Sequence, residues 1–220
     1  MKIVSISVGL PRRVLDHDRE VMTSIFKSPV GGPIMLRRLN LDGDRQSDLN
    51  VHGGKNKAVY AYPSEHYQYW REQLPETDLI WGNFGENLTT EGLREQDACI
   101  GDLYRIGAAT VKVTQPRMPC FKLGIRFGRE DMVKRFLASG RSGIYFAVIE
   151  EGAVNAGDVI EKIEAAPDAI SIADINRAYV YSRDNIDLVR RIVRSQILPR
   201  GLHQDFVDEL ALIESQASAV

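Results

Sequence analysis

Up to residue 165 the chain is dominated by short runs rich in Val, Ile and Tyr, bounded by Gly, Asp and Asn, which is typical of strands and turns. The first run alternates apolar and polar residues from Ile3 to Val8, and two later runs follow Gly101-Asp102 and Gly157-Asp158. Closely spaced strands with tight turns favour a β-barrel or a sandwich over a wound parallel sheet. The expected strands are KIVSISV, AVYAY, CIGDLYRIG, ATVKVTQ, GIYFAVIEEG and GDVIEKIE.

Two short helices are expected to interrupt these strands. The segment SEHYQYWREQL, residues 64–74, would begin with Ser64 as its N-cap. The segment REDMVKRFLASG, residues 129–140, has apolar residues at helical spacing and ends at Gly140. The sequence therefore predicts a mainly β fold, a barrel with short helices.

The pattern changes near residue 166, where EAAPDAI has the proline and small residues of a linker. Beyond it, Ser171 and Asp174 have the spacing of a capping box that opens a helix. Asn185 is placed to cap a second helix, and residues 203–214 are expected to form a third after the break at Pro199-Arg200-Gly201.

Length and composition agree with one β domain and a small helical appendage. Of 220 residues, 44% are apolar and 26% charged, ordinary values for a soluble protein that buries a core. The formal net charge of −2 indicates neither a nucleic-acid nor a membrane partner. We therefore predict a β-barrel domain over residues 1–166 and a three-helix domain over residues 167–220.

The sequence also favours a cytoplasmic location. The start of the chain, MKIVSISVGLPRRV, lacks the long apolar segment and the cleavage site of a signal peptide. The longest apolar runs, such as IYFAVI at 144–149, are far below the roughly 18 residues that a membrane span needs. Two cysteines are too few for a disulfide framework.

One of these cysteines has an unusual setting. Cys120 lies in VTQPRMPCFKLG, behind two prolines and between Arg117 and Lys122. Cations favour the thiolate, which is the nucleophilic and metal-binding form of cysteine, and prolines stiffen the loop. A buried, inert thiol remains the alternative for Cys120. Cys99, between Ala and Ile, is expected in the core.

A second candidate stretch is LDGDRQSDLNVHGGKNKAVYAY, residues 41–62. Gly53 and Gly54 allow positive φ angles, so that consecutive N–H groups can form a nest for an anion. Lys55, Lys57 and Arg45 add positive charge. A plain turn with solvated lysines is the alternative.

The acidic residues of the same stretch, Asp42, Asp44 and Asp48, do not form a calcium loop, because Ser47 and Gly53 stand where that loop needs Gly and Glu. One of them is expected to orient His52 or to pair with Arg45.

A third stretch, WGNFGENLTTEGL at 81–93, offers Glu86 and Asn87 in a small turn, as a proton donor or as hydrogen-bonding groups for a heterocycle. A turn in which Asn87 satisfies its own backbone is the alternative.

Taken together, four blocks in this order resemble the MOSC domain, named for the C-terminal domain of molybdenum cofactor sulfurases. The blocks resemble in particular the stand-alone bacterial branch typified by the YiiM proteins, over roughly residues 35–160. The tail from about residue 168 resembles the three-helix domain that follows MOSC in that branch. The blocks are GDRQSDLNVHGGKNKAVYAY, FGENLTTEGL with CIGD, QPRMPCFKLG and SGRSGIYFAVIEEGAVNAGD.

The resemblance implies a β-barrel that binds the molybdenum cofactor, with Cys120 in the place of the cysteine that ligates molybdenum. It implies reduction of small N-hydroxylated compounds such as hydroxylaminopurines and hydroxylamines, with electrons from a flavoprotein. The family also carries an association with pyridoxal phosphate binding. Where many relatives have Gly-Trp-Tyr, this chain has Gly143-Ile144-Tyr145, which would alter substrate preference if that aromatic lines the site.

The resulting hypothesis assigns catalysis to Cys120 and His52, with His52 as proton donor because its unperturbed pKa of about 6.5 suits neutral pH. Arg190, Arg191 and Arg194 are candidates for docking an acidic flavoprotein. The residues expected to bind the cofactor are Arg45, His52, Gly53, Gly54, Lys55, Glu86, Asn87, Gln115, Arg117 and Lys122.

Two other functions remain open at this point. The first is a sulfur carrier or cofactor-delivery protein that holds a persulfide on Cys120. The second is a metal-free hydrolase with Cys120 as nucleophile and His52 as base. A monomer and a homodimer are both compatible with the sequence.

Overall fold

The centre of the computed structural model, which describes residues 1–47, 53–167 and 169–217, is a mixed sheet. Within those residues the sheet has eight strands in the order β12-β8-β9-β10-β6-β7-β1-β4. Neighbouring strands are antiparallel except β6 and β7, which are parallel. The strands are β1 (Lys2–Val8), β4 (Ser28–Val30), β6 (Val59–Pro63), β7 (Leu88–Glu91), β8 (Leu103–Ile106), β9 (Ala109–Pro116), β10 (Ile144–Glu150) and β12 (Ile160–Glu164).

The sheet curls back on itself but does not close into the expected barrel. Its two ends meet through a single bridge between Lys2 and Val159, next to which the N–H of Ile160 donates to the carbonyl of Met1 at 2.8 Å. Residues Ile6 to Val8 of β1 already pair with β4, so only the first residues of β1 are available to β12. The mainly β prediction is thus supported, whereas the closed barrel is corrected to an open, curled sheet.

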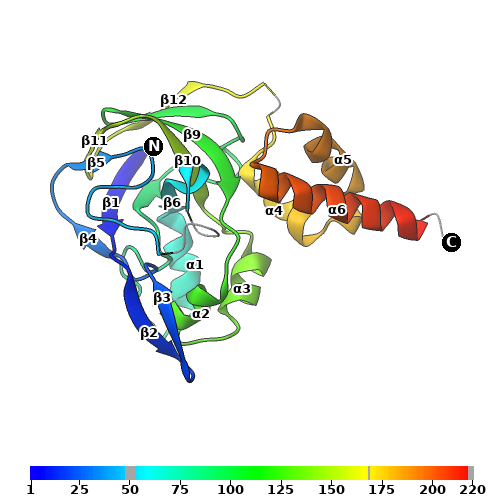
Figure 1. Ribbon diagram of the computed structural model, residues 1–220. Helices are drawn as coiled ribbons and strands as arrows, with labels where there is room; N and C mark the ends of the chain where they lie inside the picture. The colour runs from blue at the N-terminus through cyan, green and yellow to red at the C-terminus, as the bar shows by residue number, and fades with distance from the viewer. Residues whose placement is uncertain (48–52, 168, 218–220) are drawn as a thin grey trace.

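Two small sheets complete the β structure, and neither was expected. The hairpin of β2 (Arg12–Asp16) and β3 (Arg19–Thr23) projects from one end of the molecule (Figure 1). Strand β5 (Ile34–Leu36) pairs with β11 (Gly152–Val154). The hairpin is largely exposed, so its sequence lacks the apolar pattern that marks a half-buried strand.

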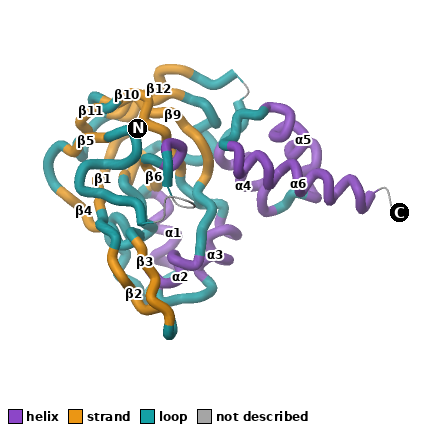
Figure 2. The backbone as a smooth tube through the Cα atoms, in the orientation of Figure 1, coloured by secondary structure: helices purple, strands orange, loops and turns teal. Residues whose placement is uncertain are grey.

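Three helices lie together beside the sheet: α1 (Glu65–Gln73), α2 (Phe121–Phe127) and α3 (Met132–Ser139), shown in Figure 2. The two expected helices correspond to α1 and α3. Gly140 ends α3 in a left-handed conformation with φ 65°. Ser64 precedes α1 as predicted, but its side chain forms no capping hydrogen bond. Aromatic side chains from α1 and α3 pack on Tyr62 and Phe84 in a second core cluster.

The C-terminal part of the chain folds into α4 (Ile172–Val180), α5 (Ile186–Ser195) and α6 (Arg200–Ala217), with a 3₁₀ turn at Arg183–Asn185. The predicted capping box is confirmed, because Ser171 and Asp174 exchange both hydrogen bonds. Helix α6 begins directly after Pro199, three residues earlier than expected, and so contains Gly201. Proline suits the entrance of a helix, where its missing N–H costs nothing.

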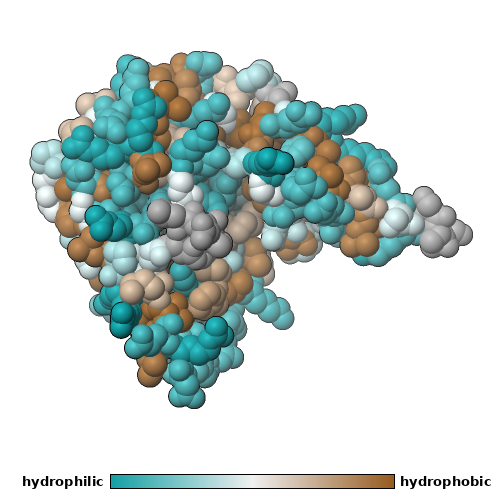
Figure 3. Space-filling view, in the orientation of Figure 1, coloured by the Kyte–Doolittle hydropathy of each residue, from teal (hydrophilic) through white to brown (hydrophobic). Residues whose placement is uncertain are grey.

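These helices lie to one side of the sheet, with the end of α6 pointing away from it (Figures 1 and 2). Ile172, Ile175 and Phe206 belong to the same buried cluster as Ile100 and Val113 of the sheet region. Backbone hydrogen bonds reinforce this contact, since Ile100 donates to Ile170 at 2.9 Å. The space-filling view shows apolar and polar side chains side by side along this extension (Figure 3).

Over the ranges that the structure describes, no helix is long and apolar enough to cross a membrane.

The shared core leads to a prediction about cooperativity. Phe206→Ala removes a side chain that is 2% exposed, and a buried Phe→Ala change costs about 3–5 kcal/mol. Both tryptophans, Trp70 and Trp81, lie outside the C-terminal helices, so their fluorescence reports on the sheet region. We expect the urea concentration at the midpoint of unfolding to fall by the same amount whether unfolding is followed by tryptophan fluorescence or by circular dichroism at 222 nm. A fluorescence midpoint that stays at the wild-type value would mean that residues 167–220 unfold as a separate domain.

Candidate functional site

Cys120 lines a cavity of about 100 Å³, which we call the thiol cavity. The cysteine stands between the end of β9 at Pro116 and the start of α2 at Phe121, and it is the N-cap residue of that helix. Pro116 and Pro119 have no N–H groups and fixed φ angles, so the chain leaves the sheet here without continuing its ladder. The thiol is free and half-buried.

The thiol cavity is strongly cationic. Among its described lining residues, five are basic and only Asp44 is acidic. Three of the cations are themselves nearly buried, with exposures of 7% for Arg117 and 8% for Lys27 and Lys122. Buried positive charges in excess over negative ones favour an anionic ligand. The five basic residues are Lys27, Arg45, Lys57, Arg117 and Lys122.

Lys57 and Arg117 are both electrostatically coupled to the thiol, and Lys57 lies at the boundary of a second cavity. Burial lowers the pKa of Lys57, and the neighbouring Cys120 partly offsets that shift when it is charged. The residue follows Gly54, whose φ of 87° confirms the expected positive angle. A 3₁₀ turn over Lys55–Lys57 then directs the chain into β6.

The acidic residue of the cavity is the centre of a buried network. Asp44 pairs with Lys27, accepts the N–H of Gly9 at 2.8 Å and accepts the side-chain amide of Asn87 at 2.9 Å. Burial lowers the pKa of Lys27, and the carboxylate of Asp44 opposes that shift. Asn87 also accepts the N–H of Tyr60 at 3.2 Å. Asn87 therefore braces the wall of the cavity.

Within the described residues no aspartate pairs with Arg45, contrary to the expectation. Asp44 pairs with Lys27, and Asp42 forms two hydrogen bonds with Arg37, each at 3.0 Å. Arg45 is exposed at the rim of the thiol cavity. Asp48 and His52 lie outside the described residues, so the role predicted for His52 stays a prediction.

Glu86 does not reach a cavity, contrary to expectation. Its side chain is 0% exposed and accepts hydrogen bonds from the N–H of Gly82 at 2.7 Å, from the N–H of Phe84 at 3.1 Å and from the hydroxyls of Tyr67 and Thr89. Burial raises the pKa of Glu86, and these donors oppose that shift. Glu86 therefore holds the 82–89 turn together and cannot contact a ligand in the thiol cavity.

A second cavity, of about 580 Å³, lies between the sheet region and the C-terminal helices, and we call it the junction cavity. Four expected cofactor residues line it rather than the thiol cavity: Gly53, Gly54, Lys55 and Gln115. The opposite wall comes from Tyr179, Pro199, Gly201, Leu202 and Asp205. The two cavities are adjacent, because Lys57, Met118 and Tyr145 line both.

The nest expected at the paired glycines is partly used by the protein itself. The N–H of Gly54 donates to the side-chain oxygen of Gln46 at 3.3 Å, and the amide nitrogen of Gln46 donates to the carbonyl of Lys57 at 2.9 Å. Gln46 thus holds this loop in shape.

The departure at Gly143-Ile144-Tyr145 affects the core rather than the site. Ile144 is 0% exposed and belongs to the main core cluster, whereas Tyr145 lines both cavities. Successive residues of a strand face opposite sides, so the two side chains cannot share an environment. Residue 144 therefore lines neither cavity.

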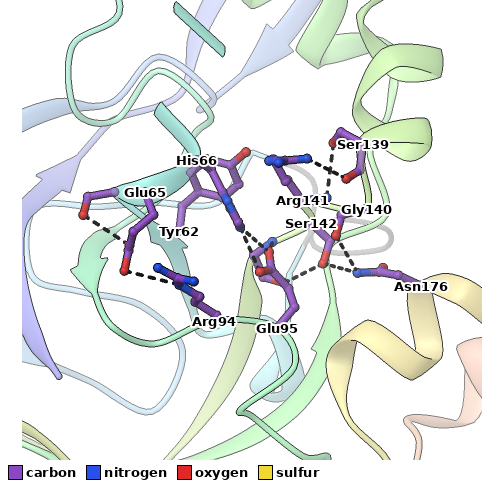
Figure 4. A network of polar contacts seen from close by, with 12 residues as sticks. Tyr62, Glu65, His66, Arg94, Glu95, Ser139, Gly140, Arg141, Ser142 and Asn176 are labelled. Carbon is purple, nitrogen blue, oxygen red and sulfur yellow. Dashed lines mark hydrogen bonds and ion pairs between the residues drawn. The ribbon is translucent and has the colours of Figure 1, made fainter. Parts of the chain in front are cut away.

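A polar network fixes the start of β10, the strand that carries Tyr145 (Figure 4). Glu95 accepts the N–H of Gly143 at 2.7 Å and contacts the ring of His66 at 2.8 Å. From α4, Asn176 donates to the hydroxyl of Ser142 at 2.8 Å. Gly143 has φ 68°, and a Cβ there would lie 2.6 Å from the carbonyl oxygen of Ala61, so only glycine fits.

The arginines proposed for docking lie on α5, and Arg190 is engaged in ion pairs within the chain. Arg190 forms ion pairs with Asp187 at 3.4 Å and with Glu214 at 3.1 Å. Part of the basic charge on this helix is thus neutralised within the C-terminal segment.

Comparison with known proteins identifies the family. The model of the MOSC domain matches residues 48–161. The YflK protein of Bacillus subtilis (strain 168) is 38% identical over 205 residues, covering 93% of this chain and 92% of that protein. The chain belongs to the MOSC domain family. MOSC domains are associated, as a family, with binding of the molybdenum cofactor.

Two further relatives of this MOSC protein are informative. The crystal structure of YiiM from Geobacillus stearothermophilus superposes with a TM-score of 0.78 at 37% identity, over 95% of this chain and 98% of that one. A protein of Gibberella moniliformis named Reductase is 35% identical over 161 residues. That match covers 72% of this chain but only 28% of the Gibberella protein.

The sequence did not single out several residues of the MOSC site. Lys27, Ser24 and Tyr60 line the thiol cavity from segments without a recognisable motif. Lys57 was noted only as an added charge, and Tyr145 only as a neighbour of Ile144. Along β6, Val59 and Ala61 face one core cluster and Tyr60 faces the other, and this two-residue period of a strand is the signal that would have placed Tyr60 on the cavity side.

The different settings of the two cysteines predict a difference in alkylation. Burial and the nearby Asp102 raise the pKa of Cys99, so little of its thiolate is present at pH 8, whereas Cys120 lines an open, cationic cavity. Iodoacetamide at pH 8 should modify Cys120 at least tenfold faster than Cys99, as followed by peptide mass spectrometry. Cys99→Ser should retain the fast alkylation that we assign to Cys120, and Cys120→Ser should lose it. Equal rates at the two thiols would contradict this description of the site.

Proposed function

We propose that this MOSC protein binds the molybdenum cofactor with its metal-bearing end in the thiol cavity and reduces small N-hydroxylated compounds, with Cys120 as the protein ligand of molybdenum. The observation that carries the proposal is a free, half-buried thiol in a cavity with five basic side chains and one acidic side chain. The name of the Gibberella relative supports a reductive role.

The residues present suit such a group. A pterin dithiolene that carries a phosphate is anionic, and Arg45, Arg117 and Lys122, which have no carboxylate partner within the described residues, would offset its charge. A thiolate is a soft ligand that suits a metal with sulfur ligands of its own. The hydroxyl of Ser24 is buried, lines the cavity and has no hydrogen-bond partner within the described residues, so a ligand there would complete its bonding.

When bound, the cofactor would supply a two-electron couple, and conversion of N–OH to N–H takes up two electrons and two protons and releases one water. The protein's part is to bind, orient and supply protons. We assign proton delivery to Lys57, since it lines both cavities next to Cys120 and burial lowers its pKa. A separate flavoprotein would return electrons to the site.

We also place this chain in the YiiM-like branch of the family, with residues 1–166 as the MOSC domain and residues 167–220 as the branch's three-helix domain. The likeness to Geobacillus YiiM over 95% of the chain supports this placement.

The proposal predicts the metal content of the protein. Protein purified without oxygen from a host that makes the cofactor should contain nearly one molybdenum per chain by elemental mass spectrometry. Cys120→Ser should contain at most a tenth of that amount, because the thiolate is lost. The matched control Cys99→Ser should retain the wild-type content.

Absence of both molybdenum and pterin from the wild-type protein would overturn the proposal. A sulfane sulfur on Cys120, detected in the same samples by intact mass, would then favour a sulfur carrier.

The assignment of Lys57 predicts a pH dependence. A lysine whose pKa is lowered delivers protons below that pKa and fails as the pH rises through it. Activity with hydroxylamine should therefore decline at a pH below the ordinary lysine value of about 10.4. Lys57→Arg keeps the positive charge but cannot release its proton in this range, so kcat/KM for hydroxylamine should fall at least tenfold and the alkaline decline should disappear.

Lys112→Arg, an exposed change on β9, is the control and should leave the profile of kcat/KM unchanged. An alkaline decline that is the same in Lys57→Arg and in wild type would remove Lys57 from proton delivery.

A further inference from the structure

We propose that the junction cavity is the substrate compartment of this site, and that α4 and α6 form the wall that selects substrates by size and shape. This inference rests on the proposed function, because it assigns the thiol cavity to the cofactor. It reassigns Gly53, Gly54, Lys55 and Gln115 from the cofactor to the substrate.

The size and position of the junction cavity fit that role. Its volume of about 580 Å³ lies within the roughly 300–1,000 Å³ of small-molecule sites. It shares Lys57, Met118 and Tyr145 with the thiol cavity. A molecule bound in it therefore lies next to the thiol cavity and beside the proposed proton donor.

The side chain of Gln115 points to a ligand in this cavity. Gln115 is 6% exposed and lines the cavity, and its side-chain amide has no hydrogen-bond partner within the described residues. The amide is not among the fully buried polar atoms, so it is open to the cavity, where a ligand or water can complete its hydrogen bonds. The amide offers one acceptor and two donors toward the compartment.

The opposite wall adds an acceptor of its own. Asp205, on the first turns of α6, is exposed and has no ion pair or hydrogen bond within the part of the chain that the structure describes. Its carboxylate can accept an N–H group of a bound molecule.

Two tyrosines suggest a planar occupant. Tyr145 comes from the sheet and Tyr179 from α4, and both line the junction cavity. Tyr179 remains 43% exposed although it packs edge-on against Phe206 at 6.3 Å. The exposed ring of Tyr179 and the adaptable side chain of Met118 suit a flat ring.

The helical wall is held in a fixed place. Asn176 of α4 donates to Ser142 at 2.8 Å and to the carbonyl of Gly140 at 3.3 Å (Figure 4). The N–H of Ala173 donates to the carbonyl of Glu95 at 3.1 Å. These contacts join α4 to the segment that leads into β10 and Tyr145. The two walls of the compartment are therefore positioned relative to each other before a ligand binds.

Gly201 provides a direct way to fill the compartment. It is the second residue of α6 and lines the junction cavity, and a Cβ built there meets no atom within 4 Å. Its φ is not in the left-handed region, so a larger residue is compatible with the helix. Gly201→Trp should therefore occupy the cavity without a clash at its own Cβ.

The test compares benzamidoxime, which carries a ring, with hydroxylamine, which has two heavy atoms. Reduced methyl viologen supplies electrons, and molybdenum content is measured on every sample. Gly201→Trp should lower the ratio of kcat/KM for benzamidoxime to kcat/KM for hydroxylamine at least tenfold. Gln204→Trp introduces the same side chain at an exposed position of α6 that lines neither cavity, and its ratio should equal that of wild type.

An unchanged ratio in Gly201→Trp overturns the inference. A loss of molybdenum and pterin in Gly201→Trp, with retention in Gln204→Trp, also overturns it, because the cofactor would then extend into the junction cavity.

Binding of benzamidoxime, measured by calorimetry on the protein as purified, separates this inference from the proposed function. A dissociation constant raised at least tenfold by Gly201→Trp supports the compartment even if the protein contains no molybdenum and reduces nothing. Equal dissociation constants in wild type and Gly201→Trp, or no binding to wild type, overturn it.

Gln115→Met gives a second test that does not depend on the tryptophan. The two side chains are similar in length, and removing an amide that lacks a partner is not expected to destabilise the protein. The thermal midpoint should stay the same or rise while the dissociation constant for benzamidoxime increases severalfold. A lower midpoint together with unchanged binding would show that Gln115 is a structural residue and would overturn its assignment.

Discussion

The buried contact between Lys27 and Asp44 organises the region on which the site depends. Asp44 also accepts the N–H of Gly9 and the side-chain amide of Asn87, and Asn87 in turn holds the backbone of Tyr60. One carboxylate thereby joins the end of β1, the segment before β4, the loop after β5 and the start of β6. Breaking a buried pair of this kind by removing one partner typically costs about 3–5 kcal/mol. The same network supplies the floor of the thiol cavity and its one described acidic group, so the surplus of positive charge there is built into the fold.

The features predictable from the sequence were those encoded by nearby residues. Alternation identified β1, the spacing of Ser171 and Asp174 identified the capping box, and the prolines around Cys120 marked a rigid loop. Lys27 and Tyr60 were missed because they reach the cavity only through pairings between distant segments. Glu86 was expected at the site for a related reason. The local sequence Gly85-Glu86-Asn87 does not show that four donors surround the Glu86 carboxylate in the fold. Closure of the sheet was overestimated because the pairing of β4 with β1 involves a strand of three residues that the sequence does not mark.

On the proposed function, the two cavities divide the tasks of the site between cofactor and substrate. The thiol cavity is formed within the sheet region, whose loops and turns place the cations around Cys120. The junction cavity has one wall from that region and one from α4 and α6, and Lys57, Met118 and Tyr145 lie between the two. Changes in the helical wall can therefore alter what is admitted while the surroundings of the thiol stay the same. On the proposed function, related chains could change substrates through their C-terminal helices and keep one chemistry.

The length and direction of α6 also bear on where this protein can be linked to a surface or to another protein. The helix has 18 residues, so it is about 27 Å long. Its first turns line the junction cavity, and its far end points away from the sheet (Figure 1). A surface tether, a fluorescent label or a fused electron-transfer partner joined at that end would leave both cavity mouths uncovered. A force applied at that end would be transmitted along the helix to its first turns, which form a wall of the proposed compartment. The helix is therefore a suitable attachment point for mechanical or electrochemical control.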